Sequence, residues 1–230
     1  MTFRLLTCFS LAAALLPAAA LQGKVELVDA KKKGSAEGVV VWLEPLSNPR
    51  PPSPGKFVMD QRNKKFLPHI LAIPTGSQVD FPNNDPIFHN AFSNFSGQPF
   101  DTGLYAPGTS QKITFRRPGA VRVFCNIHAH MSAVIVVVPT PYFATSGAAG
   151  GFRIDNVPAG DYTLKVFHER ATEKTLAALE RRITVSADQD LGAVKISESG
   201  YLEVGHKNKH GHDYPPVPAE TGPYPGKKGK

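Results

Sequence analysis

The sequence predicts an all-β protein, with one larger and one smaller β-sandwich, from three observations. The 230-residue chain contains 21 Pro and 20 Gly, and only 20% of its residues are charged. Proline is nearly twice as frequent as the usual ~5%, and it interrupts helices. Apolar residues recur mostly in short alternating or continuous runs, and no long amphipathic helix is visible. We therefore expect strands joined by turns rather than a helical bundle.

Short apolar runs bounded by turn signals mark the expected strands in chain order. They lie at about residues 23–28, 38–44, 66–74, 78–81, 112–115, 121–125, 133–138, 152–155, 162–167, 182–185 and 192–196. A Pro-rich break at 47–55 and a small-residue linker at 144–152 separate the middle strands from the rest. Residues 172–182 have the composition of a short helix.

Residues 1–20 have the pattern of a secretory signal, with Arg4, an apolar stretch and a final Ala18-Ala19-Ala20. A buried N-terminal helix is the alternative. Cleavage after Ala20 would remove Cys8 and leave Cys125 as the only thiol, which excludes an internal disulfide and any metal site of four thiolates. We expect a periplasmic or secreted protein, and no apolar run is long enough for a membrane span.

These breaks divide the chain into a signal at 1–20, a central domain at 56–139, flanks at 21–55 and 140–200, and a tail at 201–230. The central block carries eight basic and four acidic side chains, whereas the flanks carry twelve of each. This excess is either general mild basicity or a steering patch for an acidic partner. No dense basic stripe with interleaved aromatics is present, so nucleic acid is not an expected partner.

The tail is polar, with almost no apolar spacing, and is predicted to be disordered. Its histidines could scavenge metal or simply be solvated. They are His206, His210 and His212.

The segment Cys125-Asn-Ile-His128-Ala-His130-Met131 concentrates metal-binding groups between two expected strands. It holds a thiol, two imidazoles and a thioether within seven residues. Soft sulfur ligands combined with imidazole select copper or zinc over magnesium or calcium. If one loop histidine binds, the second imidazole must come from elsewhere. His89, in the polar segment FPNNDPIFHN, is the best candidate.

The Cys-x2-His-x2-Met loop and the upstream N-N-x-x-x-F-H-N segment resemble the cupredoxins, most closely the plastocyanin and amicyanin group. The resemblance covers about residues 56–139 and implies a Greek-key β-sandwich with one type 1 (blue) copper. It implies four metal ligands: His89, Cys125, His128 and Met131.

Three further positions matter to this resemblance. Asn90 stands where the family supports the copper-bound sulfur. Ile127 stands where plastocyanins usually carry proline, and His130 lies beside the methionine, so either His130 or Met131 could be the axial ligand.

Other candidate residues have two interpretations each. His69 alternates with apolar neighbours and is expected at the rim of the core rather than at the metal. The aromatic residues Phe88, Phe92, Phe95 and Phe100 either cover the core or form an apolar patch for docking.

The flanks resemble a carboxypeptidase regulatory-like (transthyretin-like) β-sandwich, with residues 151–166 similar to its second half and 23–45 to its first. If both hold, the central domain is inserted into a split outer sandwich. The combined layout resembles exported proteins of the methylamine-utilisation or plastocyanin-like type.

The expected function is that of a monomeric, non-enzymatic electron carrier with one type 1 copper. Its redox partner would present an acidic surface or an apolar patch. The alternative is a copper-binding storage or delivery protein without electron transfer. A structural module with an inactive metal site is a third possibility.

Overall fold

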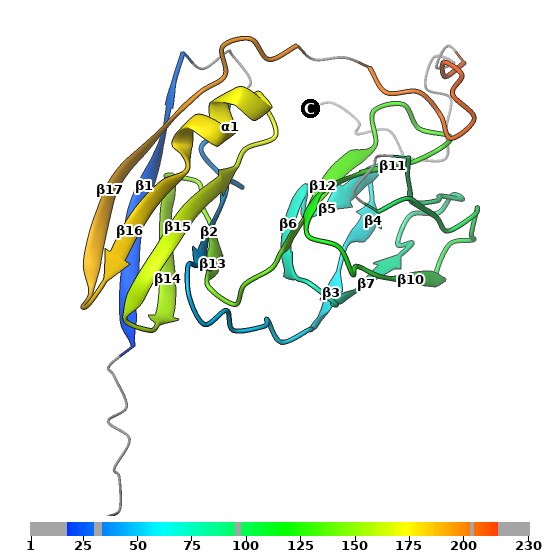
Figure 1. The fold of residues 1–230 in the computed structure, drawn as a ribbon. Coiled ribbons are helices and arrows are strands. Elements are labelled where there is room, and N and C mark those ends of the chain that lie inside the picture. The colour runs from blue at the N-terminus through cyan, green and yellow to red at the C-terminus, as the bar shows by residue number, and fades with distance from the viewer. Residues whose placement is uncertain (1–17, 30–33, 95–97, 203–204, 216–230) are drawn as a thin grey trace, which may run out of the picture.

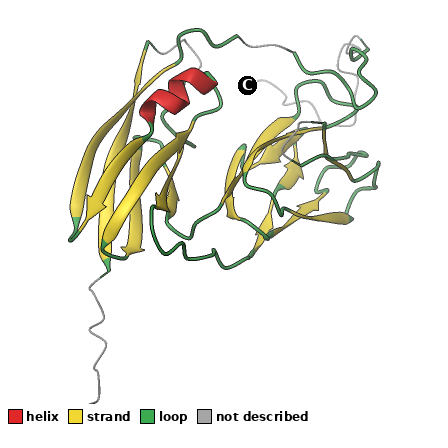
Figure 2. Cartoon of the chain, viewed as in Figure 1, coloured by secondary structure: helices red, strands yellow, loops and turns green. Residues whose placement is uncertain are grey.

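Two β-sandwiches lie side by side in the computed structural model, which describes residues 18–29, 34–94, 98–202 and 205–215 (Figure 1). Strands dominate, and the described residues contain one short helix (Figure 2). The predicted all-β class is therefore confirmed.

The outer sandwich combines strands from both ends of the chain. One sheet has the order β14-β1-β17, and the other has the order β13-β2-β15-β16. The first sheet consists of β14 (Gly151–Val157), β1 (Ala19–Val28) and β17 (Gln189–Ser197). The second consists of β13 (Phe143–Thr145), β2 (Val40–Pro45), β15 (Gly160–Phe167) and β16 (Arg181–Val185). Each sheet thus joins strands that precede and follow the middle of the chain, as a split sandwich requires.

Alternation builds the core of this sandwich. Along β15, Tyr162, Leu164 and Val166 are buried while the residues between them are not. The predicted helix is α1 (Glu173–Leu179), which begins after Thr172, whose side-chain oxygen accepts a hydrogen bond from a backbone N–H of the first turn.

The central sandwich comprises residues 56–138. Its sheets have the orders β10-β7-β3 and β6-β12-β11-β8-β9, and β4 and β5 form a separate hairpin. The first sheet consists of β10 (Ser110–Thr114), β7 (Gln78–Pro82) and β3 (Lys56–Val58). The second consists of β6 (Ile70–Pro74), β12 (Ser132–Val138), β11 (Gly119–Phe124), β8 (Phe92–Ser93) and β9 (Phe100–Asp101). The hairpin consists of β4 (Asp60–Arg62) and β5 (Lys65–Leu67). Most neighbouring strands are not consecutive in the chain, as in Greek-key sandwiches.

Strand β12 explains how the two sandwiches meet. Its alternate residues Ala133, Ile135 and Val137 belong to the core of the central sandwich. The residues between them, Val134, Val136 and Val138, form a separate apolar cluster with Val40 of β2. Because both of its faces are buried, the strand has a continuous apolar sequence rather than an alternating one.

The structure describes only the last residues of the predicted signal, from residue 18 onward. Strand β1 already begins at Ala19, whose side chain is buried, so cleavage after Ala20 would remove the first two residues of this strand. The rest of the expected signal, residues 1–17, lies outside the described residues. None of the described helices is long and apolar enough to cross a membrane.

Candidate metal centre

The ligand loop, residues 125–131, connects β11 to β12, and β11 is paired with β12 along its whole length. The backbone N–H of Cys125 donates to the carbonyl of Met131 at 3.1 Å, and the N–H of Met131 donates to the carbonyl of His128 at 3.1 Å. Two hydrogen bonds thus close the loop on itself. The sheet fixes both ends, so three of the four predicted ligands are held on one short, tied segment.

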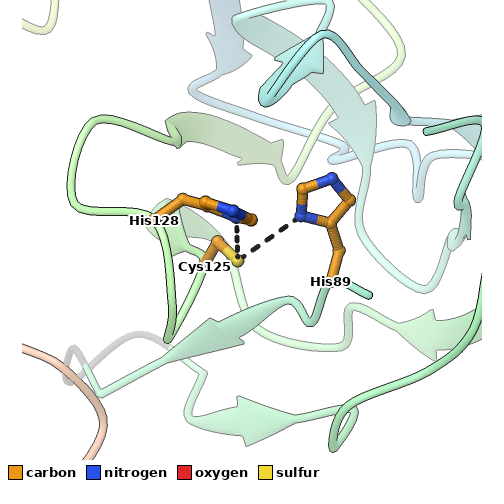
Figure 3. A group of neighbouring side chains, drawn as sticks. All are labelled: His89, Cys125 and His128. Carbon is orange, nitrogen blue, oxygen red and sulfur yellow. Dashed lines mark hydrogen bonds between the residues drawn. The ribbon is translucent and has the colours of Figure 1, made fainter. Parts of the chain in front are cut away.

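The fourth predicted ligand, His89, enters from another part of the sandwich. It precedes β8 and is held by a backbone bridge to Tyr105. Its Nδ1 lies 3.8 Å from the sulfur of Cys125, and Nδ1 of His128 lies 3.5 Å from the same sulfur (Figure 3). The three ligand atoms all lie within 4.8 Å of one another.

These separations fit a shared metal ion. Metal–nitrogen bonds of about 2.0 Å and metal–sulfur bonds of about 2.3 Å at trigonal angles place nitrogen and sulfur roughly 3.7 Å apart. The observed values of 3.8 and 3.5 Å bracket that separation. Two imidazoles, one thiolate and a thioether form the donor set of a type 1 copper site. Met131 is fully buried in the same core cluster as Cys125.

A buried carboxylate fixes the orientation of His89. Nε2 of His89 donates to Oδ2 of Asp85 at 2.7 Å, and both side chains are almost completely buried. Because the proton is on Nε2, the lone pair of Nδ1 is directed toward Cys125. No role for Asp85 was expected from the sequence, although it stands four residues before His89.

The hairpin β4–β5 holds this carboxylate in turn. The backbone N–H groups of Asn63 and Lys64 donate to Asp85 at 2.6 and 2.8 Å. Both residues have φ of +55°, in the left-handed region that non-glycine residues adopt at a cost of ~1–2 kcal/mol each. Three hydrogen bonds to one buried carboxylate offset this strain. The turn therefore holds Asp85 in place, and Asp85 in turn holds His89.

The thiol of Cys125 is buried, and burial raises its pKa. The backbone N–H groups of Asn90, Ile127 and His128 hydrogen-bond the sulfur and act in the opposite direction. Asn90 also accepts a hydrogen bond from the backbone N–H of Asn126 at 2.6 Å through its side chain. The predicted support of the sulfur by Asn90 is therefore present, through its backbone and through the loop.

The surroundings lower the pKa of both imidazoles, which favours their neutral forms. Burial lowers the pKa of His89, although Asp85 raises it. Burial also lowers the pKa of His128 to about 4, assisted by the neighbouring His89 and Lys64. Each ring can therefore offer a nitrogen lone pair without first losing a proton.

The name apolar rim is used here for three exposed apolar side chains that are sequence neighbours of His89, Tyr105 and His128. Three large apolar side chains, each next to a residue of the site, are about half exposed: Phe88 at 55%, Leu104 at 57% and Ile127 at 45%. The charge of Lys64 lowers the pKa of both His89 and His128.

The remaining candidates lie away from the cluster. His130 is exposed and does not belong to the group of His89, Cys125 and His128. His69 lies at the contact between the sandwiches, where its Nε2 pairs with Glu169 at 2.8 Å. Phe92 is buried and Phe100 is half-buried, so both fill the core, whereas Phe95 lies outside the described residues.

Part of the predicted tail contacts the central sandwich. Residues 205–215 lie against the ligand loop, where Tyr214 donates to the carbonyl of Cys125 and the ring of His206 stacks on Phe124. His210 and His212 are exposed. Residues 216–230 lie outside the described residues.

Comparisons with known proteins give the following likenesses. No family model matches the chain, and no curated protein matches it. Among solved structures, a copper-containing nitrite reductase from Thermus scotoductus is similar at 28% identity over 41% of this chain and 25% of its own, with a TM-score of 0.35. A purple cupredoxin from Nitrosopumilus maritimus is similar at 22% identity over 36% of this chain and 99% of its own, with a TM-score of 0.33. A Cu(I) form of an amicyanin mutant is similar at 19% identity over 36% of this chain and 82% of its own, with a TM-score of 0.35. These scores are low, and the case for a copper site rests on the donor atoms and their geometry.

Proposed function

We propose that the protein is an exported type 1 copper protein that carries single electrons between redox partners. The convergence of two imidazoles and one thiol on a common point supports this most strongly, because the three residues come from two distant segments. Copper, when bound, supplies a one-electron couple between Cu(II) and Cu(I). His89, Cys125 and His128 would hold it, with Met131 as the weak fourth ligand.

The surroundings of the ligands favour fast electron transfer because they resist movement. His89 is tied to Asp85, and the ligand loop is closed by its own hydrogen bonds. Residues held in this way keep one arrangement in both oxidation states, so little rearrangement accompanies the change of charge. A delivery protein would instead need ligands that open to release the metal.

The half-buried ring of His128 is the proposed exit for the electron. His89 is completely buried, whereas His128 retains exposed surface next to Ile127. The apolar rim would exclude water from the contact with a partner. Lys64 nearby supports a partner whose contact surface has an acidic margin.

The test is to add Cu(II) to the purified protein and record the visible spectrum. We expect the intense thiolate-to-copper charge-transfer band, and we expect Cys125→Ser to abolish it. His130→Ala is the matched control, because this exposed histidine lies in the same loop but outside the ligand cluster, and it should keep the band. A wild-type protein without the band, or a band that survives Cys125→Ser, would rule out the proposed site.

The alternative of copper storage or delivery depends on the histidines of the tail. His206 is engaged with Phe124 and Tyr214, which favours the electron carrier.

Export is proposed from the pattern of residues 1–20 alone. Sequencing the N-terminus of the protein recovered outside the cytoplasm tests it, and an uncleaved N-terminus would contradict it.

A further inference from the structure

The segment of residues 205–215, called here the strap, lies against the ligand loop. In Figure 1 it is the orange segment at the side of the central sandwich that faces away from the outer sandwich. There the hydroxyl of Tyr214 donates to the backbone carbonyl of Cys125 at 2.7 Å. The backbone N–H of Lys209 donates to the side-chain oxygen of Asn126 at 2.9 Å. The strap therefore binds two consecutive residues of the loop, one of them the proposed thiolate ligand.

Additional contacts hold the strap in place beside β8, β9 and β11. The ammonium of Lys209 pairs with Asp101 at 2.7 Å. The ring of His206 stacks on Phe124 with a centroid separation of 4.0 Å and an angle of 25°. Tyr214 contacts His206 in turn, edge to face. The strap thus covers Phe124 and also binds the carbonyl of the next residue, Cys125.

The strap has a defined local structure that presents these groups. The side chain of Asn208 accepts hydrogen bonds from the backbone N–H groups of His210 and His212. The N–H of Asn208 donates to the carbonyl of His212, and the N–H of Gly211, at φ +79°, donates back to Asn208. An Asn that closes a turn on its own backbone is a common way to fix a loop. Lys209 lies within this turn, so its N–H is held in position for Asn126.

The backbone of Cys125 and Asn126 is therefore fixed from two sources. Within the central sandwich, the N–H of Cys125 donates to Met131, and the N–H of Asn126 donates to Asn90. The strap adds the contacts to the Cys125 carbonyl and to the Asn126 side chain. Without it, the carbonyl of Cys125 would have to find a partner in water, and the loop would open more often.

We propose that Tyr214 is a positioning residue of the copper centre, which fixes the backbone of Cys125 and, with the rest of the strap, closes the loop over its sulfur. The part of this inference that concerns copper rests on the proposed function. The part that concerns the thiol does not, because the contacts join protein atoms alone.

The test compares Tyr214→Phe and Tyr214→Ala in a full chain that carries Cys8→Ser, so that Cys125 is the only thiol. Tyr201→Phe is the matched control, because it removes a hydroxyl from a half-buried tyrosine that packs over Arg170, away from the ligand loop. The first readout is the rate at which iodoacetamide alkylates Cys125 in the metal-free protein, which reports how often the loop opens. The second is the rate at which a chelator removes copper from the loaded protein, together with its visible and EPR spectra.

The hydroxyl of Tyr214 contacts both the carbonyl of Cys125 and, at 3.2 Å, Nδ1 of His206. We expect Tyr214→Phe to increase both rates at least about fivefold, the factor that corresponds to one hydrogen bond of ~1 kcal/mol. Tyr214→Ala should increase them further, because the edge-to-face contact of the two rings is lost as well. The spectra should shift in Tyr214→Phe, whereas the midpoint of thermal unfolding should fall by only about 2–4 °C, the change that corresponds to ~1 kcal/mol. The shifted spectra separate positioning of the loop from this small loss of general stability. Tyr201→Phe should match the parent protein in every readout.

Parent-like alkylation in both Tyr214 variants would overturn the proposal, whatever the copper results. Faster alkylation in a protein that never develops a charge-transfer band would support the strap and reject the type 1 site. Equal acceleration in Tyr201→Phe would also overturn the proposal, because the effect would then not depend on the contact with Cys125.

Discussion

Replacing Asp85 with asparagine should raise the reduction potential of the copper centre. The carboxylate is almost completely buried and lies 2.7 Å from Nε2 of His89, on the side of the ring opposite Cys125. Its charge is thus roughly 6–7 Å from a metal bound by Nδ1. With an effective dielectric constant of 20–40, one charge at that distance contributes ~1–2.5 kcal/mol. Because a negative charge stabilises Cu(II) more than Cu(I), its loss should raise the potential by about 50–110 mV, at 59 mV for each factor of ten.

Spectroelectrochemical titration of the wild-type protein and Asp85→Asn measures this shift directly. Asp155→Asn is the control, because Asp155 is exposed and paired with Arg153 in the outer sandwich, where salt screens its charge. A control shift below about 10 mV is expected. Asp85→Asn keeps the size of the side chain but not its full set of hydrogen-bond acceptors, so a loss of stability of ~1–3 kcal/mol should accompany the change in potential. A potential that stays the same or falls in Asp85→Asn would refute this electrostatic reasoning.

Three other predictions follow from the described residues. Copper binding at pH 7 should release about one proton, which comes from the Cys125 thiol with its raised pKa, because the lowered pKa values of both ligand histidines favour their neutral forms. Calorimetry in buffers of different ionisation enthalpy measures this release, and two or more protons would contradict the prediction. The pair of His69 and Glu169 raises the pKa of the histidine above 6.5 and lowers that of the glutamate below 4.5. Its contribution should therefore be greatest between pH 4.5 and 6.5, and should be lost as the pH rises through the histidine pKa or falls through the glutamate pKa. His69→Gln should cost only ~0.5 kcal/mol at pH 5.5, because the pair is partly exposed, and less at pH 9; an equal cost in urea unfolding at both pH values would argue against the pair. Gly150→Ala should destabilise the protein by ~3 kcal/mol or more, because a Cβ there would lie 2.4 Å from a backbone carbonyl oxygen. Gly103→Ala, at a residue with a positive φ but open space around it, should cost only ~1–2 kcal/mol. Similar thermal midpoints for the two variants would be inconsistent with this difference.

The sequence was sufficient to predict the longer strands and the clustering of His89, Cys125 and His128, because both have strong local patterns. It did not predict the short strands β3, β4, β8, β9 and β13, whose two or three residues carry too little pattern. The apolar run of β12 identifies a buried strand, and the short spacing from Cys125 to His128 brings two ligands together on any tight turn. The same run could not show that β12 lies between two cores. A strand has a continuous apolar sequence whenever both of its faces are buried, whether the same domain or a second sandwich covers the outer face.

Asp85 and Tyr214 were not found because their roles depend on distant contacts. The spacing between Asp85 and His89 suggests proximity only in a helix, whereas here a loop brings them together. The lack of apolar periodicity in the tail predicts disorder. Residues 205–215 contact the loop through individual hydrogen bonds and one stacked ring, which periodicity does not detect.

The pairing of β2 with β13 indicates where the chain could be divided into two separate proteins. Trp42 lies opposite Phe143 in an antiparallel register, so the chain leaves the outer sandwich and returns to it at neighbouring positions. The whole central sandwich therefore occupies the place of a hairpin turn. A short turn sequence between Pro45 and Tyr142, which is buried in the core of the outer sandwich, should close that sandwich without it, provided that the apolar face of β2 receives polar replacements. Conversely, the two adjacent ends mark residues 46–141 as a segment that could be transplanted into the hairpin of another β-protein.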